Sequence, residues 1–179
     1  MTWLGFGEVR DGIAFKVVDE RVVRGSAGLM LLLGSIAAIN GFILKNYGVL
    51  PWLSGFLVLN FALGVLVGPK VMPTFALARL LTWRQQPLWV GAVQKRFAWS
   101  LGLALSLSIF GLSFELMADA SWFNAVCRLC LICILFLYLE SAFGICVGCQ
   151  LYKLALRLKL VPRPEIVPNC TGDACAPER

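Results

Sequence analysis

The sequence predicts an all-α membrane protein, a bundle of four transmembrane helices whose N- and C-termini both lie in the cytoplasm. Hydrophobic residues make up 59% of the 179-residue chain, and its mean hydropathy is +0.81. A soluble domain has about 45–50% apolar residues. Four separate apolar stretches each supply the ~20 residues that a membrane-spanning helix needs. The basic residues lie between and after these stretches, which indicates membrane orientation and argues against a nucleic-acid partner.

Each stretch defines one element of a single unit. Residues 1–24 mix both charge signs and lack an apolar core, so we expect a cytoplasmic segment and no cleavable signal peptide. A transmembrane domain follows over residues 25–155, with helices expected at about 25–44, 50–68, 97–118 and 122–152. Three prolines after the fourth helix indicate that residues 156–179 form a flexible cytoplasmic tail.

The charged connections predict the orientation. The loop at 69–96 has no acidic residue and five basic ones, Lys70, Arg79, Arg84, Lys95 and Arg96. The link between the third and fourth helices carries Glu115 and Asp119 instead. By the positive-inside rule, the long loop and both termini are cytoplasmic. Within that loop, residues 73–84 only weakly indicate an interfacial helix, because their apolar and basic positions do not separate at helical spacing.

Cysteine is the main candidate for chemistry. The chain has seven cysteines and no histidine. The missing histidines exclude a Ser-His-Asp triad, His-ligated haem and a mixed Cys/His zinc site within this chain. A bound metal would have mainly sulfur ligands, which favours Cu(I), zinc or an iron–sulfur cluster. The sequence identifies no particular cofactor.

The sequence Cys146-Val-Gly-Cys149 is the most informative pair. Thiolate is the reactive form of cysteine, and the basic residues that follow favour it. Desolvation and the negative end of a helix that terminates there would oppose it. The alternative is that both cysteines are small residues in a tight helix contact, together with Gly144 and Gly148.

The outer cysteines are expected to be packing residues. Cys127, Cys130 and Cys133 recur every three residues and share one helix face. On a continuous helix Cys130 would lie about 24 Å from Cys146. That separation is too great for disulfide exchange between the two groups.

Glu140 is an acidic residue inside an apolar segment, where a charge is costly and usually faces a partner or a polar path. It could take up protons released in dithiol oxidation, or be a protonated carboxyl bonded to Asn60 or Ser141. Helical geometry places Glu140 on the side of Cys133 rather than of Cys146.

Cys170 and Cys175 lie in the polar tail, so lipid packing does not explain them. In a reducing cytosol they are expected to be thiols available for exchange or for metal. Together with Cys146 and Cys149 they loosely match a four-cysteine zinc spacing, although the last gap is wider than usual.

Several segments resemble an uncharacterised family of bacterial membrane proteins, domain of unknown function 4395. They are Gln94-Lys-Arg-Phe-Ala-Trp99, Glu140-Ser-Ala-Phe-Gly-Ile-Cys-Val-Gly-Cys149 with Tyr152, and the run at 18–24. The resemblance covers roughly residues 5–155. It implies a four-helix prokaryotic inner-membrane protein and singles out Glu140, Cys146 and Cys149, but it supplies no activity.

The leading hypothesis is a thiol–disulfide or sulfur-relay protein. Cys146 and Cys149 would attack and resolve a disulfide or persulfide, and Cys170 and Cys175 would pass equivalents to a soluble, thioredoxin-like partner. One alternative is a permease for a soft metal ion or small sulfur compound, with Glu140 as a polar step. Another is a non-catalytic accessory subunit of a membrane complex. The expected partners are the lipid bilayer, the soluble thiol protein and further copies of the chain; whether the protein is an enzyme stays open.

Overall fold

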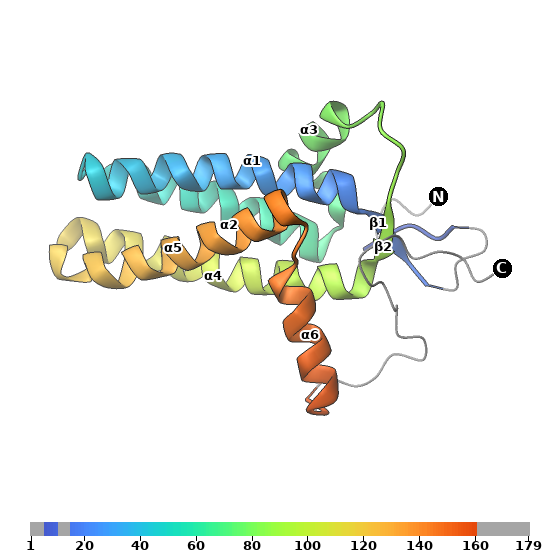
Figure 1. Ribbon diagram of the computed structural model, residues 1–179. Coiled ribbons are helices and arrows are strands. Elements are labelled where there is room, and N and C mark those ends of the chain that lie inside the picture. Colours follow the sequence, from blue (N-terminus) through green and yellow to red (C-terminus); the bar gives the residue numbers. More distant parts are fainter. Residues whose placement is uncertain (1–5, 11–14, 161–179) are drawn as a thin grey trace.

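The computed structural model describes residues 6–10 and 15–160, and it is an elongated helical bundle (Figure 1). It confirms the all-α membrane class. Four helical spans are long and apolar enough to cross a bilayer, Glu20–Ile43, Tyr47–Leu66, Ala92–Ala118 and Ala120–Phe143. Their outward faces expose leucine and isoleucine, including Leu32, Ile36, Leu59, Leu107 and Leu135. These faces contact the lipid bilayer.

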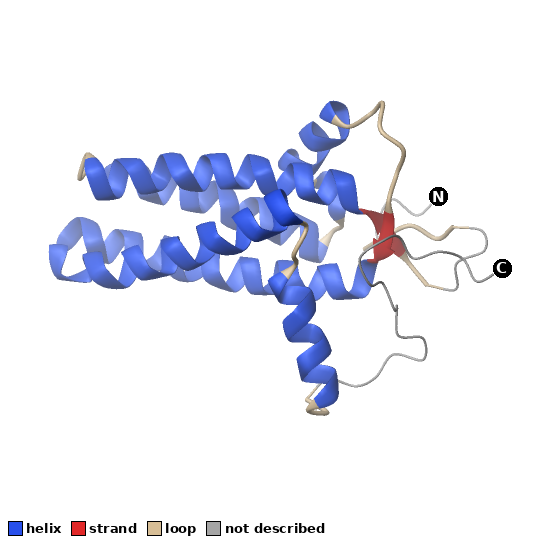
Figure 2. Cartoon of the chain, viewed as in Figure 1, coloured by secondary structure: helices blue, strands red, loops and turns tan. Residues whose placement is uncertain are grey.

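Helices dominate the described residues (Figure 2). The α-helices are α1 Glu20–Ala38, α2 Leu50–Leu66, α3 Pro73–Leu81, α4 Ala92–Ala118, α5 Phe123–Tyr138 and α6 Val147–Arg157. Two π-helical segments, η1 Ile39–Ile43 and η5 Leu139–Phe143, continue α1 and α5. Short 3-10 turns, η2 Tyr47–Val49, η3 Pro69–Val71 and η4 Ala120–Trp122, precede α2, α3 and α5.

Two spans begin earlier than the sequence predicts. Asp19 caps α1, its side chain accepting the Arg21 backbone N–H at 3.0 Å, so the helix starts at Glu20 rather than near residue 25. Helix α4 starts at Ala92 rather than 97. This shift moves Lys95 out of the expected cytoplasmic loop and into the first turn of a membrane helix.

The fourth expected helix, 122–152, is wrong as one continuous element. Gly144 has a left-handed backbone (φ 69°), and its N–H bonds the Glu140 carbonyl at 3.1 Å. Glycine adopts this conformation without the penalty of a Cβ atom, and it ends helices for that reason. Arg24 of α1 donates to the Ala142 carbonyl at 3.1 Å, satisfying an acceptor that the ended helix leaves open. Helix α6 then leaves the bundle at a steep angle (Figure 1).

A two-stranded antiparallel sheet closes one end of the bundle. Strand β1, Val17–Asp19, pairs with β2, Trp89–Gly91, so that Val18 lies opposite Val90. Glu8 extends this pairing through two backbone hydrogen bonds to Val17. The sheet ties the start of α1 to the start of α4, and so brings Glu20 and Lys95 to the same end of the molecule.

Helix α3 packs beside the first turns of α1. Ala78 contacts Gly25, where an added Cβ would lie 3.2 Å from the alanine methyl. The buried hydroxyls of Ser26 and Thr74 lie 2.7 Å apart. The other side of α3 exposes Leu77, Leu80 and Leu81. Residues 73–81 therefore form the helix that the sequence indicated only weakly, and its interfacial position stays a prediction that the exposed leucines favour.

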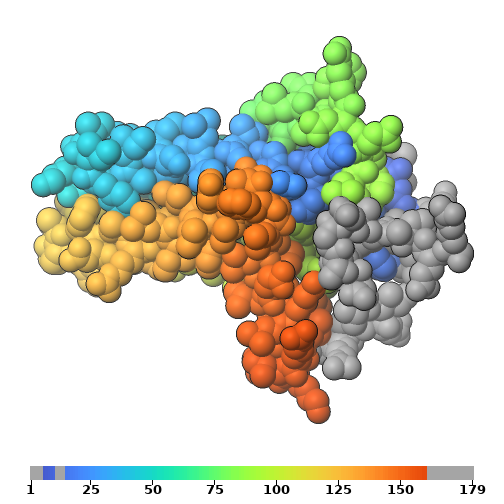
Figure 3. Space-filling view, viewed as in Figure 1, coloured from blue at the N-terminus to red at the C-terminus, as the bar shows by residue number. Residues whose placement is uncertain are grey.

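The core lies between the four spans. Phe61 of α2 packs over Gly102 of α4, where an added Cβ would lie 2.8 Å from the ring. Trp99, Met72 and Ile109 belong to the same buried cluster. In the space-filling view α6 projects from this packed bundle near its sheet-bearing end (Figure 3).

Candidate functional site

Cys146 is the N-cap residue of α6, directly before Val147, and does not lie at the C-terminal end of a helix. Its backbone is extended (φ −83°, ψ 99°), and its Sγ accepts the backbone N–H of Cys149 at 3.3 Å. The positive end of the α6 dipole therefore points at Cys146, whereas the sequence interpretation placed a negative helix end there. A cysteine that caps a helix in a C-x-x-C motif is the arrangement that lowers thiol pKa in redox proteins.

The cysteine pair lies where α6 packs closely against α4 through Gly148. An added Cβ at Gly148 would lie 2.5 Å from the Ala98 Cα of α4, so only glycine permits this close approach. The contact holds the start of α6 against α4. Cys146 and Cys149 are free thiols, and they are 8% and 9% exposed. The packing expected of this motif is present, and it also fixes the position of the two thiols.

A buried cluster of three charges lies beside the pair. Lys95, only 4% exposed, places its ammonium 2.5 Å from Glu140 Oε1 and 2.8 Å from Glu20 Oε2. The Glu20 contact is an ion pair without hydrogen-bond geometry, so that oxygen has no hydrogen-bond partner among the described residues. The three side chains come from α1, α4 and η5. We call them the charge cluster.

Glu140 therefore has a different partner from the ones that the sequence offered. Asn60 accepts hydrogen bonds from the Thr74 backbone and hydroxyl, and donates to the Met30 sulfur at 3.3 Å. It belongs to a separate polar group between α1, α2 and α3. With two carboxylates and one ammonium, the charge cluster carries a net charge of −1 when all three groups are ionised.

A cavity of about 70 Å³ connects Glu140 to the cysteine site. Both Glu140 and Cys146 line it, together with Cys133 and Met30. Glu140 shares this cavity with Cys133, as its helical position predicted, but the expectation that this excludes Cys146 is wrong, because it extrapolated a continuous helix through the break at Gly144. The 24 Å separation estimated for Cys130 and Cys146 rested on the same continuous helix.

Opposing effects act on the Cys146 thiol. A hydrogen bond with the Cys149 side chain raises the pKa of Cys146, and burial raises it further. The positive charge of Lys95 lowers it, while Glu140 raises it. The net pKa is above the ordinary thiol value. Cys146 is therefore a protonated thiol at neutral pH, and it needs a proton acceptor nearby before it can attack.

The outer cysteines lie in the packed part of the bundle. Cys133 is buried in the main core cluster, and Cys130 packs against it. Both also line a cavity of about 30 Å³ whose other walls come from α1, α2 and α4. Within 6–10 and 15–160, no group of three or more Cys, Asp or Glu side chains is arranged to hold a metal ion. Cys170 and Cys175 lie outside the described residues.

Sequence reasoning missed three residues at this site, Glu20, Arg24 and Lys95. Each was counted with a cytoplasmic segment because it lies near the end of an apolar run. A signal was nevertheless present, since an acid at position 140 inside a span requires a partner. Lys95 lies only two residues before the expected start of a neighbouring span.

The four apolar spans define a multi-pass membrane protein. The chain belongs to the family described as Domain of unknown function (DUF4395), whose model matches residues 18–157. The match confirms the family resemblance and includes the charge cluster, Cys146 and Cys149. No curated protein and no solved structure matches the chain.

Proposed function

We propose that this protein is a thiol–disulfide exchange protein of a prokaryotic inner membrane, with Cys146 and Cys149 as its redox pair. The observation that carries the proposal is the position of Cys146. It caps α6, its sulfur accepts the Cys149 amide, and a buried lysine and carboxylate lie beside it. The pair lies near the bundle end that we predict to be cytoplasmic from the basic loop.

The exchange takes two steps. The Cys146 thiolate attacks one sulfur of a partner disulfide, forming a mixed disulfide and releasing the other partner sulfur as a thiolate. Cys149 then attacks the Cys146 sulfur, closes the Cys146–Cys149 disulfide and releases the second partner sulfur, which takes up the Cys149 thiol proton. The pair loses two electrons and the partner disulfide gains them. The partner is a soluble, thioredoxin-like protein, and the reverse reaction reduces the pair.

Glu140 acts as the proton acceptor for Cys146. Transfer of the thiol proton to the Glu140 carboxylate produces a thiolate and a neutral acid, so the net charge of the site stays at −1. Conserving charge matters because a new buried charge is costly in a membrane protein. Lys95 then faces the thiolate instead of the carboxylate, and the proton returns to the departing partner sulfur.

A trapping experiment tests the proposal. Cys149→Ser leaves Cys146 able to form a mixed disulfide that cannot resolve, so a disulfide-linked adduct with a thioredoxin-like protein should accumulate in native membranes. The matched variant Cys146→Ser should give no adduct. Absence of an adduct with both variants, under conditions that oxidise cytoplasmic thioredoxin, would contradict the proposed function.

The tail dithiol has a place in the same scheme. Cys170 and Cys175 would pass electrons between Cys146–Cys149 and the soluble partner. Cys170→Ser with Cys175→Ser should slow reduction of the membrane pair by added thioredoxin and leave its reduction by dithiothreitol unchanged. If the variant were reduced at the wild-type rate by both reductants, the tail would have no part in the pathway.

A second candidate is passage of a soft metal ion. The observation in its favour is that three sulfur-containing residues, Met30, Cys133 and Cys146, line one cavity with Glu140. Thioether and thiolate ligands select Cu(I) or zinc. Stoichiometric metal in purified protein, lost in Cys133→Ser, would favour this candidate over disulfide exchange.

A further inference from the structure

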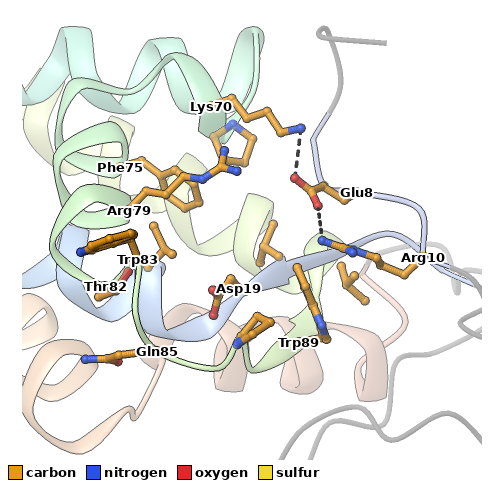
Figure 4. A pocket seen from close by; sticks show the side chains of 16 residues that line it. Glu8, Arg10, Asp19, Lys70, Phe75, Arg79, Thr82, Trp83, Gln85 and Trp89 are labelled. Atoms are coloured by element: carbon orange, nitrogen blue, oxygen red, sulfur yellow. Dashed lines mark hydrogen bonds and ion pairs between the residues drawn. The ribbon is translucent and has the colours of Figure 1, made fainter. Parts of the chain in front are cut away.

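A second, larger cavity of about 230 Å³ lies at the end of the bundle that carries the small sheet (Figure 4). Its walls come from the start of the chain, β1, α1, η3, α3 and the loop before β2. It shares no lining residue with the cavity at Cys146. The thiol chemistry makes no use of it.

The cavity borders a helix whose exposed side suits the membrane interface. One of its walls is α3, which packs on the first turns of α1 through Ala78 and Gly25. The exposed side of α3 carries Leu77, Leu80 and Leu81, and the exposed Trp83 follows it. Leucines on one side of a short helix and a tryptophan at its end are typical of an element lying in the membrane interface.

Among the residues that line the cavity, basic side chains outnumber acidic ones. Arg10, Lys70 and Arg79 line the cavity, and Glu8 lies 3.2 Å from Arg10 and 3.0 Å from Lys70. Asp19 already accepts the backbone N–H groups of Arg21 and Leu88.

Arg79 is the cation without a counter-charge. It reaches toward the cavity from α3 (Figure 4), and it makes no ion pair within the part of the chain that the structure describes. The charged residues that line the cavity are Arg10, Lys70 and Arg79 against Glu8 and Asp19, so its lining carries a net charge of +1.

The floor of the cavity is apolar. Val18, Val22 and Phe75 form part of it, and Trp89 holds the Arg10 guanidinium 4.3 Å from its ring centre. A ligand that fits these walls has an anionic group for the basic rim and a less polar part for the floor. Inorganic phosphate supplies only the first of these.

We propose that this cavity binds the headgroup of an anionic phospholipid from the adjacent leaflet. Arg79 and Lys70 hold the phosphate, and the glycerol backbone rests against Phe75 and the valine floor. Basic pockets at the cytoplasmic ends of membrane helices recognise anionic lipids through this combination of charge and depth. Glu8 competes with the phosphate for Lys70 and Arg10, and so limits the affinity.

The test uses the full-length protein in a neutral detergent. Short-chain phosphatidylglycerol is added, with phosphatidylcholine of the same chain length in a parallel arm, and bound lipid is counted by native mass spectrometry. Phosphatidylglycerol should bind as one retained molecule and raise the thermal unfolding midpoint, and phosphatidylcholine should do neither. Inorganic phosphate and glycerol 3-phosphate form two further arms, and neither should reproduce the shift.

Variants assign the binding to this cavity. Arg79→Gln should weaken phosphatidylglycerol binding roughly tenfold or more, because a charge-assisted contact is lost. Arg84→Gln removes the same charge from a residue that does not line the cavity, although its guanidinium lies over the ring of the lining residue Trp83, and this variant should bind as the wild type does. Glu8→Gln frees Lys70 and Arg10 and should tighten binding.

Three results would overturn the inference: equal losses in Arg79→Gln and Arg84→Gln, no gain in Glu8→Gln, or equal retention of phosphatidylcholine. A shift produced by inorganic phosphate alone would replace the lipid with a soluble anion.

Discussion

At the scale of single residues, Lys95 links the two acids of the charge cluster to the thiols. Its ammonium is within ion-pair distance of Glu20 and Glu140, and it acts electrostatically on Cys146. Buried ion pairs add little net stability, but removing one partner is costly because it leaves an uncompensated charge. Single substitutions in the charge cluster are thus expected to destabilise the fold, whereas replacing all three charges together should cost little stability.

Lys95→Met should lower the free energy of unfolding by about 3–5 kcal/mol, since Glu20 and Glu140 would remain as two buried acids without a cation. The triple variant Glu20→Gln, Lys95→Met, Glu140→Gln should recover most of that loss. Equilibrium unfolding in mixed micelles measures both. Equal losses in the single and triple variants would show that packing, not charge, dominates at this site.

The proton-acceptor role of Glu140 predicts a particular pH profile. Exchange of a proton between Cys146 and Glu140 involves no proton from solvent, so alkylation of Cys146 should depend only weakly on pH around neutrality. In Glu140→Gln the proton must leave to solvent, and the rate should rise about tenfold per pH unit up to a pKa above the ordinary thiol value.

The measurement uses the alkylating reagent iodoacetamide on a protein whose only cysteine is Cys146. Parallel profiles in the two proteins would rule out Glu140 as the acceptor.

Gly148 tests the close contact that holds the cysteine pair. Gly148→Ala places a Cβ 2.5 Å from the Ala98 backbone and should cost about 1–3 kcal/mol by forcing α6 away from α4. Gly111→Ala is the control, because nothing lies within 4 Å of its added Cβ. It should be neutral or stabilising by up to about 1 kcal/mol. Thermal unfolding of both variants decides whether the contact is as tight as described.

At the scale of elements, the break between α5 and α6 produces the site. The π-helical segment η5 carries Glu140, Gly144 turns the chain, and Cys146 starts a new helix. π-Helical turns often occur at functional positions. The sequence indicated Glu140 and Cys146 but not the helix break between them. The apolar run continues through Gly144, and the two glycines, Gly144 and Gly148, are typical of ordinary helix packing. The Arg24 contacts that end the helix join positions more than 100 residues apart.

Helix α6 should lie along the membrane surface rather than continue a span. Tyr152 and Leu156 face the bundle, Leu151 and Gln150 are both exposed, and Leu151 begins an apolar face. Spin labels at 150 and 151 in a cysteine-free background should therefore differ, with oxygen relaxing the label at 151 and a water-soluble nickel complex relaxing the label at 150. Equal relaxation at both positions would indicate a helix that leaves the membrane upright.

At the scale of the whole molecule, hydropathy alone predicted the membrane class and the number of spans. Crossing a bilayer requires ~20 apolar residues, and that requirement leaves a clear signal. The first residues of α1 and α4 give a weaker sequence signal, because the charged residues there are typical of a loop. Only the structure shows that Glu20, Lys95 and Glu140 compensate one another's charge. Strands β1 and β2 are three residues each, too short for an alternating pattern.

The orientation stays a prediction that one experiment can check. The α1–α2 and α4–α5 connections lie at the bundle end opposite the sheet and the loop between α3 and β2 (Figure 1). Single cysteines at 46 and 121 should react with an impermeant maleimide in intact cells, and a cysteine at 86 only after lysis. The reverse pattern would place the cysteine pair outside the cytoplasm and require an extracytoplasmic partner.

The central claim is that Cys146 and Cys149 form one reversible disulfide. The most direct measurement is a redox titration of the full chain in native membranes, equilibrated with glutathione buffers and followed by mass-resolved thiol trapping. We predict a single two-electron transition in which Cys146 and Cys149 are protected together while Cys127, Cys130 and Cys133 do not change, and which is lost in either single serine variant. Two cysteines that remain independently alkylated across the whole range of potentials would contradict the account.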